Sequence, residues 1–529
     1  MAALPLNSHG LSLSIRVQGF TKSARTMLFN SLPFLLGFLP VTFAGFFLIG
    51  VRSSKLAAAW LGAASLFFYG WWNVEFVSLL LASIVFNFTA GYFISRNGKT
   101  MSPRAHFALL TFAVASNLVL LGYYKYANFF GASIAVLIGV PLHMDAILLP
   151  LGISFFTFTQ IAFLVDAYRG QASEYNFAHY LLFVTYFPHL IAGPILHHKQ
   201  MIPQFERPET YRISSANISI GLTIFAIGLI KKVLIADRLA LVSTPIFSTT
   251  LNGGEPALIE AWVGALAYTL QLYFDFSGYS DMAIGLSRMF NVKLPLNFAS
   301  PYKAVNIIEF WRRWHITLST FLRDYLYIPL GGNRKGKRRR YINLFLTMLL
   351  GGLWHGAAWT FVAWGALHGL YLITNHGFRA LRARFGWKTN CYRRLGVFAS
   401  GLLTFISVVV AWVVFRAETF QSAQVMLNGM FGGAGLSAHK VFAISGLSDN
   451  DLVLVILGLL AVFLLPNTQE FMRDFDPAYE KVEAPLRLFA GWHWAPERAW
   501  TWLPIAVLFA IALVGMSPHR VSEFLYFQF

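Results

Sequence analysis

A histidine, His355, lies inside a stretch that is apolar enough to cross a lipid bilayer. Residues 351–369 read GGLWHGAAWTFVAWGALHG, and His355 stands between a tryptophan and a glycine, away from either charged flank. Ionisable side chains within membrane spans are rare and often mark functional pathways. A medium of low dielectric disfavours the charged imidazolium, and a neutral imidazole can act as a general base. We therefore expect His355 to remove the proton of a hydroxyl group in a group-transfer reaction.

Other histidines have simpler explanations. A packed side chain whose ring nitrogens bond to backbone carbonyls, Ser or Thr is the alternative for His355, and it is favoured for His368, which would lie on roughly the opposite face of a continuous helix. His197 and His198 would point about 100° apart on a helix, and no third ligand accompanies them, so no metal site is expected. The chain lacks the G-x-S-x-G, P-loop, H-E-x-x-H and C-x-x-C patterns.

A second segment that could take part in chemistry is 304–330, AVNIIEFWRRWHITLSTFLRDYLYIPL, which has charged residues among aromatic ones. Read as one helix, it has an aromatic face and a polar face. The aromatic face holds Phe310, Trp314, Leu318, Phe321 and Tyr325, and the polar face holds Arg312, His315, Ser319 and Arg323. Glu309 and Arg313 are spaced for an ion pair, and Asp324 continues an adjacent polar stripe. Such a helix would lie at the membrane interface or face a watery cavity.

The composition of the chain indicates the environment in which these residues lie. The chain is 57% hydrophobic and 12% charged, with a mean hydropathy of +0.58, which is typical of a polytopic membrane protein. A span needs about 20 apolar residues. Runs of this kind lie at 31–51, 56–72, 76–95, 105–125, 129–150, 216–235, 257–275, 341–356, 358–377, 395–415, 451–466 and 500–517. We predict an all-α protein with about 11 to 13 transmembrane helices.

Two more apolar stretches, 151–169 and 178–196, contain prolines and glycines. We expect them to form re-entrant or broken helices that are buried in protein and line a cavity. The longest polar interval, 467–499, is too short for an ordinary soluble domain and would form a surface excursion with interfacial helices. No repeat of 20 to 50 residues is apparent. One membrane domain is therefore expected.

The formal charge of +18 does not indicate nucleic acid, because the basic residues cluster in loops between spans. Six of the seven residues in 334–340 are Lys or Arg. A second cluster comprises Arg379, Arg382, Arg384, Lys388, Arg393 and Arg394. The positive-inside rule places both clusters in the cytosol. They could also bind the phosphates of an anionic cytosolic substrate such as a coenzyme.

This orientation fixes the depth of His355. Fifteen residues of helix beyond Arg340 advance about 22 Å, past the middle of a hydrocarbon core that is about 30 Å thick. Because residues 341–378 join two cytosolic clusters, they should form a hairpin. Its glycines, Gly351, Gly352 and Gly356, would allow a bend or close helix packing near the histidine.

The N-terminal residues and the single cysteine provide no candidate functional site. Residues 1–26 lack the features of a cleaved signal peptide, and Met27 begins a natural first span, so we expect 1–26 to be an extension upstream of the native start. Cys391 is the single cysteine, so no disulfide framework or zinc cluster can form.

Together these motifs resemble a known family. FWRRWHITLSTFLRDYLYIPLGGN (310–333) and LWHGAAWTFVAWGALHG (353–369) resemble the membrane-bound O-acyltransferase superfamily, in the branch of the alginate O-acetylation membrane subunit and the D-alanine transfer protein of teichoic acids. The segments 149–170, 187–195 and 273–298 are similar to that branch as well. The resemblance covers nearly all of 27–529, with a signature core at about 149–378.

The resemblance implies helices tilted around a central funnel or tunnel. It also implies that His355 is the catalytic histidine and that His315 is the second signature histidine. We expect seven further residues to contact substrate or line the tunnel: Trp354, Trp311, Arg312, Ser319, Arg323, Asp324 and Asn333.

The activity implied is transfer of an acyl group, usually acetyl, from a cytosolic thioester such as acetyl-CoA to a polysaccharide hydroxyl across a bacterial inner membrane. The acceptor would be an alginate-like exopolysaccharide or a periplasmic or extracellular partner protein that completes the transfer. No bound cofactor or metal and no nucleic acid is expected. A polytopic transporter and a non-catalytic scaffold of a secretion complex are the alternatives.

Overall fold

A computed structural model describes residues 27–97, 100–140, 145–174, 176–191, 193–386, 393–436, 449–482, 491–516 and 524–525. These described residues form helices and contain no strand, which confirms the all-α prediction. The proposed extension 1–26, Lys388 and Cys391 lie outside the described residues.

The first part of the chain supplies a group of helices around α6. Its helices are η2 (Pro33–Phe38), α1 (Leu39–Gly50), α2 (Ser54–Trp72), α3 (Glu75–Asn97), α4 (Pro103–Leu121), η3 (Gly122–Tyr126), α5 (Ala127–Ile138), α6 (Ile153–Tyr168), α7 (Phe177–Thr185), α8 (Phe187–Leu190), α9 (His198–Phe205) and η4 (Pro208–Tyr211).

The middle and the end of the chain supply the longest helices and the two segments, 310–333 and 353–369, that carry the family resemblance. Their helices are α10 (Ser215–Ile230), η5 (Lys231–Ala236), α11 (Asp237–Leu251), α12 (Leu258–Met289), η6 (Pro301–Lys303), α13 (Ile307–Arg313), α14 (Ile316–Leu322), η7 (Arg323–Tyr327), α15 (Gly336–His355), α16 (Trp359–Arg384), α17 (Arg393–Arg416), α18 (Phe420–Met430), α20 (Asp449–Leu464), α21 (Thr468–Phe471), η8 (Arg473–Phe475) and α22 (Ala499–Gly515).

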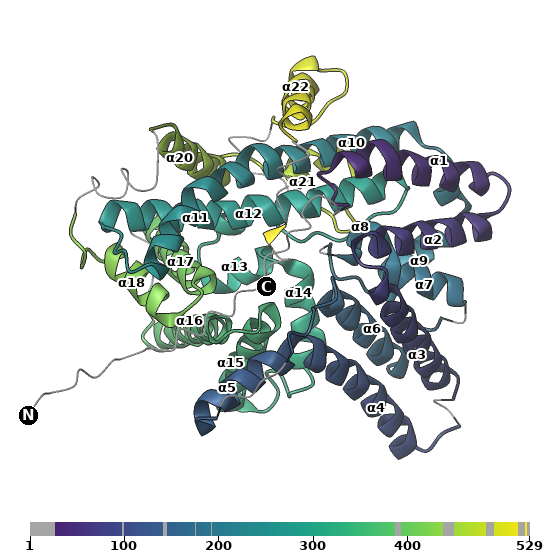
Figure 1. Ribbon diagram of the computed structural model, residues 1–529, viewed down its shortest axis with the longest axis horizontal. Coiled ribbons are helices and arrows are strands. Elements are labelled where there is room, and N and C mark those ends of the chain that lie inside the picture. Colours follow the sequence, from purple (N-terminus) through teal and green to yellow (C-terminus); the bar gives the residue numbers. More distant parts are fainter. Residues whose placement is uncertain are drawn as a thin grey trace, which may run out of the picture.

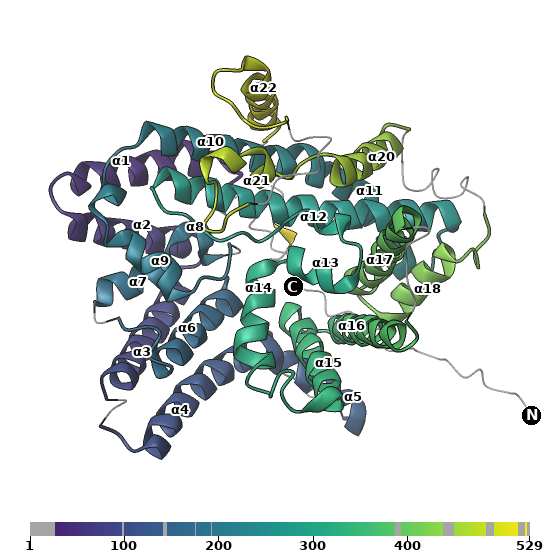
Figure 2. The same cartoon turned by 180° about the vertical axis from the view of Figure 1, so that it is seen from behind.

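The continuous rod of α10, η5 and α11 lies along α12, and together they run through the long dimension of the molecule (Figure 1). α1 and α2 lie at one end of this pair, and α16, α17 and α18 lie at the other. The view from behind shows α13 and α14 between these two groups, with α15 beside α14 (Figure 2). The segment 304–330, which contains α13 and α14, is therefore held near the centre of the fold.

Five of the described helical rods are long and apolar enough to cross a membrane. They are Pro33–Gly50, Glu75–Arg96, Pro103–Ile138, Ser215–Leu251 and Leu395–Arg416, and the shorter apolar helices are Ile153–Tyr168, Asn450–Leu464 and Ala499–Gly515. Length and composition alone therefore select fewer spans than the 11 to 13 of the sequence prediction, because α12 and α15 carry charges and α6 is short.

Two predicted boundaries are wrong. The expected spans 105–125 and 129–150 form one rod over Pro103–Ile138, because a π-helical turn, η3, joins α4 to α5 without a break despite Gly122 at its start. The stretch 151–169 contains an unbroken helix, since Gly152 precedes α6 and adopts a φ of +69° there. The break expected in 178–196 is confirmed at Tyr186, between α7 and α8.

The amphipathic segment 304–330 is also not the continuous helix that its periodicity predicts. It divides into α13, α14 and η7, and His315 separates α13 from α14 with a φ of +42°. The single aromatic face and the single polar face therefore do not exist. The ion pair within the first piece is confirmed, because Arg313 NH2 lies 2.7 Å from Glu309 Oε1.

Buried charges join the central helices, a feature absent from the sequence prediction. Lys231 contacts Asp281 over 2.6 Å, and Lys232 contacts Asp275 over 2.6 Å and Asp237 over 3.0 Å. A buried charge is tolerated when an opposite charge and hydrogen bonds compensate its lost hydration. The pairs with Asp281 and Asp275 accordingly connect the α10–α11 rod with α12, whereas the pair with Asp237 lies within the rod.

Candidate active site

His355 is the last residue of α15, and its imidazole is enclosed by aromatic rings. Its side chain is buried, with 4% of the residue exposed. The ring centroids of Trp354 and Trp364 each lie 5.0 Å from that of His355, and the centroid of Phe415 lies 5.4 Å away. The tryptophan and phenylalanine rings provide the low dielectric that keeps an imidazole uncharged.

The end of α15 is capped by side chains from η3. The Lys125 ammonium donates to the carbonyl of Trp354 over 2.6 Å and to that of His355 over 3.2 Å. The Tyr126 hydroxyl donates to the carbonyl of Leu353 over 2.9 Å. The last carbonyls of a helix lack partners within the helix, and a cation at this end is favoured by the helix dipole. Residues from η3 therefore fix the backbone that carries His355.

Close packing of α15 on α16 explains the glycines before the histidine. A Cβ atom on Gly352 would lie 2.3 Å from the Phe361 carbonyl oxygen and 2.9 Å from Gly365 Cα. A Cβ atom on Gly356 would lie 2.1 Å from the Phe361 ring. The predicted hairpin with glycine-mediated packing is thereby confirmed, because only glycine permits this approach.

His315 occupies a strained position that a short extended segment stabilises. Its φ of +42° and ψ of 56° are unusual for a residue with a side chain, and such a conformation costs about 1–3 kcal/mol. Asn297 compensates, because its carbonyl accepts from the Ile316 N–H over 3.0 Å and its Oδ1 lies 2.9 Å from His315 Nδ1. The turn at His315 is therefore held by contacts with a segment nearly twenty residues earlier in the chain.

These contacts also determine the tautomer of His315. Asn297 Oδ1 accepts from the Thr317 backbone N–H over 3.4 Å and from the Thr317 hydroxyl over 3.0 Å. The backbone N–H is an unambiguous donor, so the atom facing it is the amide oxygen. His315 Nδ1 must then carry the proton that it donates to this oxygen. In a neutral ring, Nε2 is consequently the unprotonated nitrogen, which is a hydrogen-bond acceptor.

Trp354 connects the two signature histidines. Its ring centroid lies 5.0 Å from that of His355 and 6.1 Å from that of His315. It also stacks at 5.3 Å on Phe158, which in turn stacks at 4.1 Å on Phe321. Side chains from α6, α14 and α15 thus form one aromatic wall beside both imidazoles.

His368 belongs to the same aromatic region in a packed position, as favoured from the sequence. Its Nδ1 accepts from the Trp311 indole N–H over 3.3 Å. The ring centroids of Trp364 and His368 are 4.8 Å apart, so His355 and His368 contact the same indole. Their expected separation on opposite faces is wrong, because the chain leaves the helix between α15 and α16 and helical spacing does not apply across the break.

The structure brings only part of the predicted set together. His355, His315, Trp354 and Trp311 lie in or beside the aromatic region. Ser319 is half-buried on α14 and donates to the Trp314 carbonyl over 3.3 Å. The other predicted lining residues, Arg312, Arg323, Asp324 and Asn333, have different surroundings.

The side chains of these four residues are exposed or half-buried. Arg323 and Asp324 form an ion pair of 2.6 Å, with 61% and 26% of their side chains exposed. Asn333 is exposed and accepts from the Tyr327 hydroxyl over 2.6 Å. Arg312 is exposed and lines a cavity of about 500 Å³. Their role as tunnel-lining residues stays a prediction, as does the tunnel.

The adjacent His197 and His198 contact separate carboxylates. His197 Nδ1 lies 2.9 Å from the Tyr325 hydroxyl and 3.6 Å from Asp166, whereas His198 Nε2 lies 3.2 Å from Glu174. Within the described ranges, no group of three or more His, Cys, Asp or Glu side chains could hold a metal ion.

Sequence reasoning missed Lys125 and Asn297. A signal existed for Lys125, because it is a lysine within the apolar stretch 103–138. Asn297 had no comparable signal, since an isolated asparagine in a loop is an ordinary turn residue. Both act on the signature histidines through contacts that only the folded chain creates.

Known proteins are similar to this chain over most of its length. The model of the membrane-bound O-acyltransferase family matches residues 105–415. A peptidoglycan O-acetyltransferase of Helicobacter pylori is 43% identical over 441 residues, which cover 78% of this chain and 81% of that protein. A probable alginate O-acetylase of Pseudomonas putida is 42% identical over 514 residues, covering 95% of this chain and 100% of the relative. A teichoic acid D-alanyltransferase of Bacillus subtilis is 27% identical over 283 residues, covering 51% and 69%.

Proposed function

This chain belongs to the membrane-bound O-acyltransferase family, and we propose that it transfers acetyl groups from a cytosolic thioester to hydroxyl groups of a bacterial polysaccharide. It is a multi-pass membrane acyltransferase. Relatives named as O-acetylases of alginate and of peptidoglycan align with most of its length at similar identity, and both names describe O-acetylation of a polymer. Because both names share the acetyl group, we propose acetyl as the group transferred, with a polysaccharide as the class of acceptor.

One observation supports the site of chemistry: His355 and His315 are buried around the same indole, Trp354. In the proposed reaction His355 removes the proton of the acceptor hydroxyl, and the oxygen attacks the thioester carbonyl carbon. The carbon–sulfur bond then breaks, and the proton passes to the leaving thiolate. The imidazole returns to its neutral form, so no net proton is gained or lost.

The tautomer of His315 favours a role beside the acceptor. Its Nδ1–H is donated to Asn297, and the Nε2 lone pair can accept a hydrogen bond from a hydroxyl group. A neutral ring in this tautomer cannot donate from Nε2 to the thioester carbonyl oxygen. We assign His315 to orientation of the acceptor hydroxyl and His355 to its deprotonation.

The direction of transfer follows from the basic loops. The clusters at 334–340 and 379–394 belong on the cytosolic side by the positive-inside rule, in what we propose is the inner membrane of a bacterium. The donor is then a cytosolic thioester such as acetyl-CoA. The acceptor is the polysaccharide itself or a periplasmic or extracellular partner protein that completes the transfer.

The test is acetyl transfer by purified protein in lipid nanodiscs supplied with radiolabelled acetyl-CoA and a hydroxyl acceptor. His355→Ala should lower thioester cleavage by about 10²- to 10⁴-fold, the usual contribution of a general base. His376→Ala is the matched control, because His376 is half-buried near the far end of α16. Equal cleavage by His355→Ala and wild-type protein would refute the proposed chemistry.

A further inference from the structure

The cavity that Arg312 lines lies beside α13 and differs in chemistry from the aromatic candidate active site. Its volume is about 500 Å³, and its lining comes from the extended segment 296–299, from α13, from Arg379 on α16 and from the segment 467–482. These parts of the chain are far apart in sequence. Arg379 belongs to the second basic cluster, which we place on the cytosolic side.

The cavity carries excess positive charge. Arg312, Arg379 and Lys481 line it, and none of them forms an ion pair within the part of the chain that the structure describes. The fourth cation, Arg313, is neutralised by Glu309 at 2.7 Å. With Glu470 included, the lining holds four cations and two carboxylates, and this net positive charge favours an anionic ligand.

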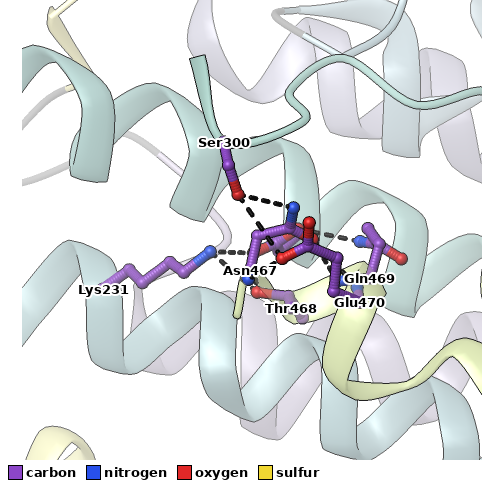
Figure 3. Close-up of polar contacts among 7 residues, drawn as sticks. Lys231, Ser300, Asn467, Thr468, Gln469 and Glu470 are labelled. Atoms are coloured by element: carbon purple, nitrogen blue, oxygen red, sulfur yellow. Dashed lines mark hydrogen bonds and ion pairs between the residues drawn. The ribbon is translucent and has the colours of Figure 1, made fainter. Parts of the chain in front are cut away.

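The acidic residue on the opposite wall is engaged by its own segment. Glu470 accepts from the Asn467 N–H over 2.8 Å and from the Ser300 hydroxyl over 3.5 Å (Figure 3). Its carboxylate therefore caps α21 and ties it to Ser300 instead of pairing with the cations of the cavity. Glu470 keeps its negative charge, and the lining as a whole remains net positive.

A buried acceptor in the lining gives a second, independent indication of a ligand. Gln469 is 3% exposed, and its Nε2 donates to Asp281 over 3.0 Å, which fixes the orientation of the amide. Its Oε1 has no hydrogen-bond partner among the described residues. Figure 3 shows this oxygen on the side of the amide away from its contact. A buried acceptor without a partner is costly, and a ligand hydroxyl or N–H would satisfy it.

The cavity and the candidate active site share one wall. Leu296, Phe298 and Ala299 line the cavity, whereas Asn297 between them bonds to His315. The Phe298 ring packs 5.0 Å from that of Trp314. The two sites thus lie on opposite faces of the same four-residue segment.

We propose that this cavity binds a phosphate ester, with Arg312, Arg379 and Lys481 contacting the phosphate and Gln469 accepting from a donor group of the same ligand. Two sources of the phosphate share this chemistry: the nucleotide end of the acyl donor and the headgroup of an anionic phospholipid. The assignment to the donor rests on the proposed function, since only a transferase with a cytosolic coenzyme thioester needs that ligand.

The experiment measures equilibrium binding in the His355→Ala background, so that turnover does not complicate it. Protein in zwitterionic nanodiscs is titrated with radiolabelled coenzyme A, and thermal stabilisation by added phosphatidylglycerol is measured in parallel. Arg312→Ala, Arg379→Ala and Lys481→Ala should each weaken binding of one probe on the order of tenfold, the effect of losing one charge-assisted hydrogen bond. Arg338→Ala, at an exposed position in the first turn of α15, should change neither.

Loss of coenzyme A binding assigns the phosphate to the donor, and loss of the phosphatidylglycerol effect assigns it to a lipid. Arg312→Lys keeps the charge and should bind more tightly than Arg312→Ala, which separates the lost contact from misfolding. Wild-type binding of both probes by all three alanine variants would overturn the proposal. Because binding is measured without turnover, failure of acetyl transfer alone would refute the proposed function and leave this site standing.

Discussion

Asn297 Oδ1 accepts the Nδ1–H of His315 over 2.9 Å and thereby orients this histidine from the irregular segment that follows α12. The same side chain binds both the N–H and the hydroxyl of Thr317. One asparagine thus fixes the backbone, the ring plane and the tautomer of His315. In metal sites a partner on the second ring nitrogen has the same orienting effect on histidine.

We expect Asn297→Leu to lower kcat for acetyl transfer by about 10²-fold, because the His315 ring loses its orientation. The KM for the thioester should change little, since we assign His315 to the acceptor and not to the donor. Asn297→Asp keeps an oxygen acceptor for His315 and Thr317 and should recover most of the lost rate. Steady-state kinetics in nanodiscs would show it, and an Asp variant as slow as the Leu variant would argue against the orienting role.

His315→Ala should retain measurable activity, unlike His355→Ala. The lost hydrogen bond to the acceptor hydroxyl corresponds to about 10- to 100-fold in rate, because orientation is reduced while the general base remains. Initial rates at saturating thioester test this expectation. A wild-type rate in His315→Ala would remove His315 from the site.

Lys125→Met should disturb the end of α15. The carbonyls of Trp354 and His355 would lose their donor, which costs about 1–3 kcal/mol, and His355 would be less precisely placed. Lys125→Arg restores a cationic donor and should be intermediate, whereas Lys55→Met in the exposed first turn of α2 is the neutral control. The midpoint of thermal unfolding and the acetyl-transfer rate are measured together. Unchanged values in Lys125→Met would show that water or neighbouring groups replace the amine.

Gly352→Ala should separate α15 from α16. The new methyl group would meet the Phe361 carbonyl oxygen at 2.3 Å, and overpacking of this kind costs about 1–3 kcal/mol. Gly377→Ala is the matched control on α16, because no atom lies within 4 Å of its Cβ position. The control should be stabilised by about 0.5–1 kcal/mol, since alanine has the higher helix propensity. Equal unfolding temperatures of the two variants would contradict the close crossing.

Cysteine labelling tests the orientation in a Cys391→Ser background. A cysteine at Lys335, in the first basic loop, should resist a membrane-impermeant maleimide in intact cells. A cysteine at Glu255, in the loop between α11 and α12 that has no Lys or Arg, should react. Both should react after permeabilisation. Labelling at 335 but not at 255 in intact cells would reverse the topology.

The sequence determined the properties that depend on local composition. Apolar runs predicted the all-α architecture, and most of them fall within the observed helices, because about 20 apolar residues in lipid must satisfy their own backbone hydrogen bonds. The spacing of Glu309 and Arg313 predicted their ion pair. His355 stood out because an ionisable group in an apolar run is costly and therefore conspicuous.

Tertiary structure decided what surrounds the histidines. Helical periodicity assumed a continuous helix over 304–330, and the break at His315 re-aimed every side chain beyond it. Lys125 reaches the end of α15 from about 230 positions earlier in the chain. No local pattern encodes such a pairing, because it depends on which helices pack together and not on the residues beside it. The tautomer of His315 and the shared wall with the basic cavity follow from that packing alone.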